Sequence, residues 1–284
     1  MNLLKNVLKG VIMGVANIIP GVSGGTMAVS MGIYDDIIFS VTHLFSQFKK
    51  SIKILFPYLL GMVVGLVGLA QIIEILLDNY NMPTNFAFIG LILGGLQSIV
   101  GRLKGKKVGV GCGLCFCIFF AMIIGLQFLK GQDAASIQLS TEPMQLVLVF
   151  FIGIIASATM VIPGVSGSMI LMILGYYEPI LEYINSFVRA LSKGDWDVLL
   201  NKGAVLVPFG IGVVFGIFVI AKIIEILLRK WETLTFSAIL GLVAASPFAV
   251  LMNARIPALG FGNISASVLA FAVGFGIAYF LGRE

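Results

Sequence analysis

The chain has 284 residues, of which 59% are hydrophobic and only 11% are charged, and its formal net charge is +5. Soluble domains carry charge on about a quarter of their residues, because their surfaces face water. An ordinary soluble enzyme, a disordered chain and a nucleic-acid-binding protein are therefore excluded, and an integral membrane protein is predicted. The 34 glycines agree with this, since helices that pack closely within a membrane are rich in small residues.

The chain begins with an apolar region at 3–46 that is interrupted by the motif IPGVSGG at 19–25. Proline lacks an N–H group and glycine is a poor helix former, so this motif cannot continue a helix. Non-helical backbone inside a bilayer persists only where protein or a water-filled cavity surrounds it. We therefore expect region 3–46 to form a re-entrant helical hairpin, which enters and leaves the membrane on one side.

Three apolar runs follow at 54–77, 86–101 and 108–129, and a transmembrane helix needs about 20 such residues. The third run contains all three cysteines of the chain: Cys112, Cys115 and Cys117. No histidine or acidic residue stands near them, so we interpret them as small apolar residues of a helix. The sequence predicts no metal site and no cofactor.

The second half of the chain repeats this pattern. A second interrupted region at 144–187 carries IPGVSGS at 162–168, and apolar runs follow it at 204–228, 235–253 and 264–281. The octet AQIIEILL at 70–77 returns as AKIIEILL at 221–228. We therefore predict an all-α membrane protein of two copies, 1–143 and 144–284, each with one hairpin and three transmembrane helices.

The distribution of positive charge predicts that the second copy is inverted relative to the first. If each copy crosses the membrane three times, twelve of the 18 Lys and Arg residues lie on the cytoplasmic side and five lie outside. If each interrupted region crossed once instead, Lys5 and Lys9 would lie opposite Lys49, Lys50 and Lys53. The first topology fits much better, and it places both termini in the cytoplasm. The net charge of +5 is thus a marker of topology.

The two interrupting loops form the predicted binding site. Broken helices expose N–H groups and a positive dipole end, which favour an anion, and serine and threonine hydroxyls add donors. The alternative is that the loops are only kinks with close glycine packing, but their repetition in an inverted pair favours a site. The predicted binding residues are Pro20, Gly21, Ser23, Gly24, Gly25 and Thr26 in the first copy, and Pro163, Gly164, Ser166, Gly167 and Ser168 in the second.

Six ionisable residues are candidates for coupling or gating. Glu74 and Glu225 occupy equivalent places in the repeated octet, and Lys222 stands one helical turn before Glu225. Asp35 and Glu178 follow the two loops at equivalent positions, and Arg102 is a possible cationic partner of an anion. A purely structural role at helix ends is the alternative for the acidic residues. His43, the single histidine, lies outside the repeated motifs and is interpreted as an interfacial residue.

The segment GVIMGVANIIPGVSGGTMAVSMGIYDDII at 10–38 resembles the opening signature of the bacterial polyprenyl-phosphate translocases of the PopT type. The second IPGVSG and FIGLILGG at 88–95 are also similar to that family's pattern. The resemblance implies a non-enzymatic flippase in the bacterial cytoplasmic membrane that returns undecaprenyl phosphate for reuse in cell-wall synthesis. Ser168 and Met169 stand where the first copy has Gly25 and Thr26, so the two loops need not contribute equally.

Two other functions remain open at this point. An anion channel or exchanger would use the same physics, since chloride channels also place broken helices in an inverted repeat. A polyprenyl-pyrophosphate phosphatase is the weaker alternative, because no His, Arg or acidic residue adjoins the loop serines. The expected partners are a polyprenyl-phosphate lipid and membrane lipids, with no nucleic acid, and the sequence leaves the oligomeric state open.

Overall fold

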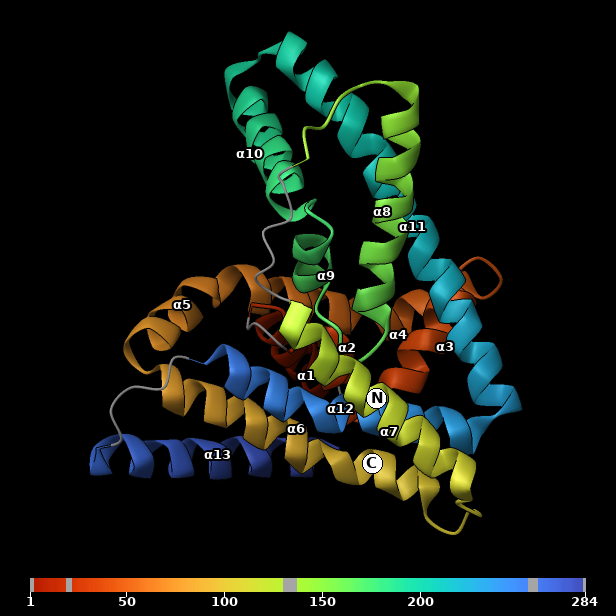
Figure 1. The fold of residues 1–284 in the computed structure, drawn as a ribbon, viewed down its shortest axis with the longest axis vertical. Coiled ribbons are helices and arrows are strands. Elements are labelled where there is room, and N and C mark those ends of the chain that lie inside the picture. The colour runs from red at the N-terminus through yellow and green to blue at the C-terminus, as the bar shows by residue number, and fades with distance from the viewer. Residues whose placement is uncertain (1–2, 19–21, 130–136, 255–259, 283–284) are drawn as a thin grey trace. The chain divides into compact units, whose positions relative to one another are not determined.

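The computed structural model describes residues 3–18, 22–129, 137–254 and 260–282, and within these ranges every regular element is a helix (Figure 1). The elements from the first predicted copy are α1 (Leu3–Ala16), α2 (Gly24–Ser30), α3 (Tyr34–Thr42), α4 (Phe48–Val63), the π-helix η1 (Val64–Gly68), α5 (Ala70–Asn79), α6 (Asn81–Leu103) and α7 (Val110–Leu129). Those from the second are α8 (Pro143–Val161), α9 (Gly167–Ile173), α10 (Tyr177–Lys193), α11 (Trp196–Lys230), α12 (Glu232–Asn253) and α13 (Phe261–Leu281).

Seven of the described segments are long and apolar enough to cross a membrane. Six of them overlap the six predicted runs, and the seventh is α8, the first arm of the second predicted hairpin. Its counterpart α1 has only 14 residues, which is short for a span. Large apolar side chains such as Val268, Leu269 and Val273 on α13 are exposed, as expected of a helix that faces lipid.

The described helices recur at the spacings of the sequence repeat. Helices α2 and α9 have the same length of 7 residues and start 143 residues apart, and each is followed by a left-handed glycine, Gly32 (φ 69°) and Gly175 (φ 76°). Helices α6 and α12 start 151 residues apart, after Tyr80 and Trp231, which have nearly the same backbone conformation. The inverted arrangement of the copies stays a prediction.

The run expected as a single helix at 54–77 is the main correction to the sequence-based elements. Helix α4 begins earlier, at Phe48, passes into η1 at Val64, and is separated from α5 by a bend at Leu69. The equivalent region of the second copy is one continuous helix, α11, of 35 residues. The reason lies in η1, which contains Gly65 and Gly68, whereas the position equivalent to Gly68 in α11 is Val219.

The chain forms two compact units that do not follow the predicted repeat boundary. The first contains Met1–Gln127, Ile162–Val165 and Ala221–Glu284, and the second contains Phe128–Val161 and Ser166–Ile220. In the first unit, α13 runs alongside α6, and α12 also packs on α6 (Figure 1). A side chain at Gly90 or Gly274 would collide with backbone of the facing helix, so these two glycines allow α6 and α13 to pack closely.

Helices of the two predicted copies are exchanged within this first unit. Helix α6 of the first copy packs against α13 of the second, and α12 of the second packs against α7 of the first at Gly241, which faces the carbonyl oxygen of Phe116. Gly90 and Gly241 occupy equivalent places in the repeat. The pair α6–α13 and the pair α12–α7 therefore have their close contact at the same position of the repeat.

Candidate functional site

The first signature loop, residues 19–26, is buried where the structure describes it. Ser23 is the N-cap of α2: its Oγ accepts a hydrogen bond from the backbone N–H of Thr26 at 3.2 Å and lies 3.0 Å from the Thr26 hydroxyl. The N–H of Gly24 donates to Asn17 Oδ1 at 2.8 Å, and Gly25 is buried in the first turn of α2. Pro20 and Gly21 lie outside the described residues. The donors of this loop are thus largely used within the protein.

A hydrogen bond joins the two signature loops. The backbone N–H of Gly164 donates to Thr26 Oγ1 at 2.8 Å, and both residues belong to the first compact unit. Gly164 has φ 83° and packs directly on the backbone of Leu242, so a side chain there would be both strained and obstructed. Pro163 beside it is fully buried. Two loops that are far apart in the sequence but equivalent in the repeat are therefore in direct contact.

The second half of the second signature loop differs from the first loop. Ser166 is the N-cap of α9, but its side chain makes no capping hydrogen bond. Its hydroxyl lies 3.0 Å from that of Ser168, which is exposed, and Gly167 packs near Thr159. The two loops thus offer different groups: the Ser23 and Thr26 hydroxyls are buried and bonded, whereas those of Ser166 and Ser168 are accessible.

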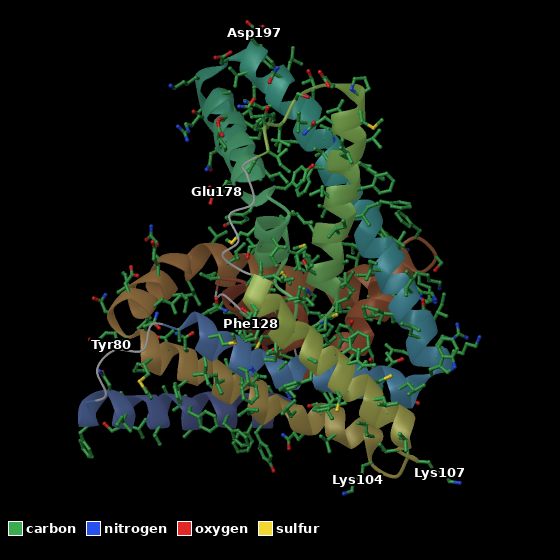
Figure 2. All side chains as sticks on the ribbon, in the orientation of Figure 1. Tyr80, Lys104, Lys107, Phe128, Glu178 and Asp197 are labelled. Carbon is green, nitrogen blue, oxygen red and sulfur yellow. The ribbon has the colours of Figure 1, made fainter. Side chains whose placement is uncertain are left out.

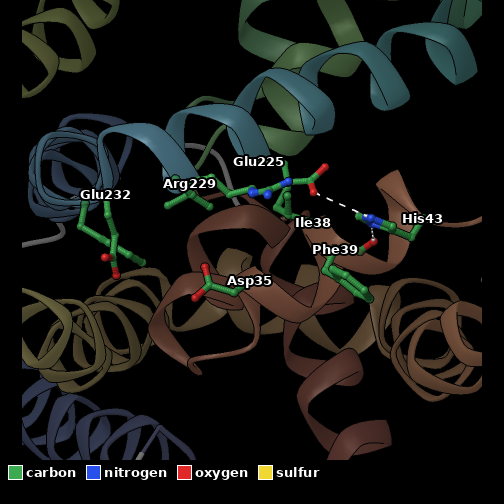
Figure 3. Close-up of a pocket in the computed structure, with 9 residues that line it drawn as sticks. Asp35, Ile38, Phe39, His43, Glu225, Arg229 and Glu232 are labelled. Atoms are coloured by element: carbon green, nitrogen blue, oxygen red, sulfur yellow. Dashed lines mark hydrogen bonds and ion pairs between the residues drawn. The ribbon is translucent and has the colours of Figure 1, made fainter.

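Two of the predicted ionisable residues, Asp35 and Glu225, line a cavity of about 370 Å³ in the first unit (Figure 3). The cavity lies between α3, the end of α11 and the start of α12, and we call it the α3–α11 cavity. Its polar lining residues are Asp35, His43, Glu225, Arg229 and Glu232. Its apolar lining residues are Ile38, Phe39, Leu228 and Phe236.

Each carboxylate of this lining pairs with a cation that lies outside the lining. The pairs are Asp35 with Arg102 at 2.9 Å, Glu225 with Lys222 at 2.8 Å, and Glu232 with Lys106. Asp35 belongs to α3, which is not one of the seven candidate spans. Burial raises the pKa of the Asp35 carboxyl, and the Arg102 guanidinium opposes that shift.

Three of the five polar residues that line the cavity were not among the predicted site residues: His43, Arg229 and Glu232. His43 was interpreted as interfacial, yet its Nε2 lies 3.9 Å from Glu225 Oε1 and its ring stacks on Phe39 with centroids 4.2 Å apart. Arg229 was counted only as a cytoplasmic marker. The available signal for Arg229 was its spacing of four residues from Glu225, which places both on one face of a helix. His43 carries no such signal, because its partner is distant in the sequence.

The other predicted acidic residues lie elsewhere. Glu74, the repeat equivalent of Glu225, is exposed on α5 and belongs to no described cavity. Glu178, at the start of α10 (Figure 2), lines a cavity of about 580 Å³ in the second unit, together with Glu182, Tyr183 and Lys202. The structure thus places Asp35 and Glu225 in the lining of the α3–α11 cavity and pairs them with Arg102 and Lys222 from outside it. Glu74 and Glu178 are not in that lining.

The seven apolar helices and the paired broken-helix loops define a multi-pass membrane protein with its polar groups collected at loop and cavity sites. The chain belongs to the undecaprenyl phosphate translocase-like family, whose model matches residues 13–259. The resemblance seen at residues 10–38 is thereby confirmed.

Two curated relatives are similar over most of the chain. A protein of Staphylococcus aureus (strain NCTC 8325 / PS 47), named polyprenyl-phosphate transporter, is 31% identical over 98% of this chain and 95% of its own length. A protein of Vibrio cholerae serotype O1 with the same name is 31% identical over 86% of this chain and 76% of its own length. No solved structure matches the chain. The relatives' names agree with the prediction of a transporter.

Proposed function

We propose that the chain is a flippase for polyprenyl phosphate in the bacterial cytoplasmic membrane, and that it returns undecaprenyl phosphate to the cytoplasmic leaflet for reuse in cell-wall synthesis. Membership of the translocase-like family and the names of both relatives support this substrate. The apolar outer surface of helices such as α13 supports a path in which the polyprenyl tail remains in lipid while the head group crosses beside or within the protein.

The head group crosses, in this proposal, at the two signature loops. The observation that carries it is the hydrogen bond from the Gly164 N–H to Thr26 Oγ1, because it holds two matching helix breaks together. Within the first unit, the Thr26 hydroxyl holds Gly164 of the second loop in place. The accessible hydroxyls of Ser166 and Ser168 are the donors that a phosphate oxygen would meet.

Alternating access follows from the predicted inversion of the two copies. The exchange of α6 with α13 and of α12 with α7 supports a pseudo-two-fold relation between the copies. Lys104 and Lys107 at the turn between α6 and α7 (Figure 2), and Arg229 and Lys230 at the end of α11, support a cytoplasmic location for these helix ends. Both termini are then cytoplasmic.

A transport assay with the purified protein tests this function. Proteoliposomes loaded with undecaprenyl phosphate are followed for appearance of the lipid in the opposite leaflet. The double variant Ser166→Ala/Ser168→Ala should lower the transport rate by about tenfold or more. The reason is that a hydrogen bond to a charged group contributes roughly 1.5–3 kcal/mol. Ser192→Ala is the matched control, because Ser192 is an exposed residue on α10 whose hydroxyl donates to the Arg189 carbonyl. Equal rates for both variants would remove these serines from the path.

The alternative functions have their own readouts in the same preparation. Chloride or fluoride flux without movement of the lipid identifies an anion channel or exchanger. Release of phosphate from undecaprenyl pyrophosphate identifies a phosphatase. Either result without lipid transport would replace the proposed function.

A further inference from the structure

The α3–α11 cavity has a cation in its lining that no carboxylate neutralises. Its three carboxylates, on Asp35, Glu225 and Glu232, are each paired with a cation from outside the lining. Arg229 lines the cavity and is exposed, and it forms no ion pair among the residues that the structure describes. When the three carboxylates are counted together with the cations that pair with them, Arg229 is left as one net positive charge at the cavity.

Four of the nine residues that line this cavity are apolar. Ile38 and Phe39 come from α3, Leu228 from α11 and Phe236 from α12. The volume of about 370 Å³ falls within the range of roughly 300–1,000 Å³ that is typical of small-ligand sites. An unpaired cation beside apolar side chains suits a molecule with an anionic end and a hydrocarbon body better than it suits a free ion.

The position of the cavity along the chain points to the membrane interface. Arg229 and Lys230 end α11, and Trp231 precedes α12. Basic residues mark the cytoplasmic ends of membrane helices, and tryptophan is enriched where a helix meets the head groups. The Lys230 ammonium lies over the Trp231 ring, at 4.7 Å from its centroid.

We propose that the α3–α11 cavity holds the phosphate head group and first isoprene units of the transported lipid at the cytoplasmic end of its path, with Arg229 as the phosphate-binding residue. A guanidinium presents a planar fork of donors that matches phosphate oxygens, so it both attracts and orients the head group. This inference rests on the proposed function and adds to it a second site, apart from the signature loops, where the lipid is held before release.

Binding of a short lipid to the full-length protein tests the site. The chain has two tryptophans, Trp196 and Trp231, so the background variant Trp196→Phe leaves Trp231 as the only one, next to Glu232 in the cavity wall. This protein, in phosphatidylcholine nanodiscs, is titrated with farnesyl phosphate while the Trp231 emission is recorded. Arg229→Gln should weaken binding by about ten- to hundredfold, and Arg229→Lys should weaken it less, because lysine keeps the charge without the fork. Lys104→Gln, an exposed cation that does not line the cavity, is the control and should bind as the background protein does.

Competitors separate the sources of the phosphate. Farnesol and inorganic phosphate should each bind at least tenfold more weakly than farnesyl phosphate, since each lacks one of the two parts that the cavity accommodates. If inorganic phosphate or phosphatidylglycerol competes as well as farnesyl phosphate, the cavity is a general anion site and the proposal is overturned.

The outcome is distinguishable from a failure of the proposed function. If wild-type protein moves undecaprenyl phosphate while Arg229→Gln binds farnesyl phosphate normally, the cavity assignment is wrong and the transport function stands. If wild-type protein moves no undecaprenyl phosphate, the transport function is wrong and this inference fails with it. If Arg229→Gln binds farnesyl phosphate more weakly and transports undecaprenyl phosphate more slowly, and Arg229→Lys lies between it and wild type, the cavity assignment and the transport function are both supported.

Discussion

Thr26 is the residue whose replacement tests the contact between the two signature loops. It is fully buried, and its hydroxyl both accepts from the Gly164 N–H at 2.8 Å and lies 3.0 Å from Ser23 Oγ. Thr26→Val keeps the shape of the side chain but leaves the Gly164 N–H buried without its partner. Such an orphaned donor costs roughly 1–3 kcal/mol, which corresponds to a fall in the unfolding temperature of about 2–12 °C.

The assay compares Thr26→Val with Thr26→Ser in two measurements. Thermal unfolding in detergent gives the stability, and the proteoliposome assay gives the transport rate. Thr26→Ser keeps the hydroxyl and loses one buried methyl group, at a cost of about 1 kcal/mol, so its transport should stay near that of wild type. If Thr26→Val is as stable and as active as wild type, the hydrogen bond between the loops does not hold the site together, and the reasoning is refuted.

Two further predictions use matched pairs of variants. A side chain at Gly61 would collide with the carbonyl oxygen of Val7, so Gly61→Leu should abolish the peak of folded protein in size-exclusion chromatography in detergent. Gly101 faces open space, so Gly101→Leu should elute as wild type does. Glu225→Gln removes a buried carboxylate shared by a lysine and a histidine, so it should change the pH profile of transport. Glu74→Gln, at the exposed equivalent position, should leave the pH profile of transport as in wild type. If both variants change the pH profile in the same way, the distinction between Glu225 and Glu74 is refuted.

The helices were largely predictable because each is encoded locally. A run of about 20 apolar residues has few alternatives to a membrane helix, and the repeated PGVSG motifs mark helix breaks through proline and glycine. The bend at Leu69 was not predictable from apolarity, since the run at 54–77 stays apolar through it. The glycine at position 68, where the other copy has Val219, is the difference between the two regions that favours a break in the helix.

The candidate site was predictable in its parts but not in its assembly. The pairing of Glu225 with Lys222 follows from helical spacing, because residues three apart share a face. The proximity of His43 to Glu225, and of Arg102 to Asp35, joins residues that are distant along the chain. No local pattern encodes such contacts, which arise only when α3, α6 and α11 pack.

The sequence by itself determined that this is an all-helical membrane protein with two matching helix breaks, because hydropathy, proline and glycine act on their own neighbourhood. Only the tertiary structure decided which groups of those breaks remain available. Packing buried Ser23 and Thr26 and used their hydroxyls within the protein, while Ser166 and Ser168 stayed accessible. It also left Arg229 without an ion pair, among the described residues, beside three neutralised carboxylates. Availability depends on what surrounds a group in space, and nearly identical motifs therefore differ in which of their hydroxyls are accessible.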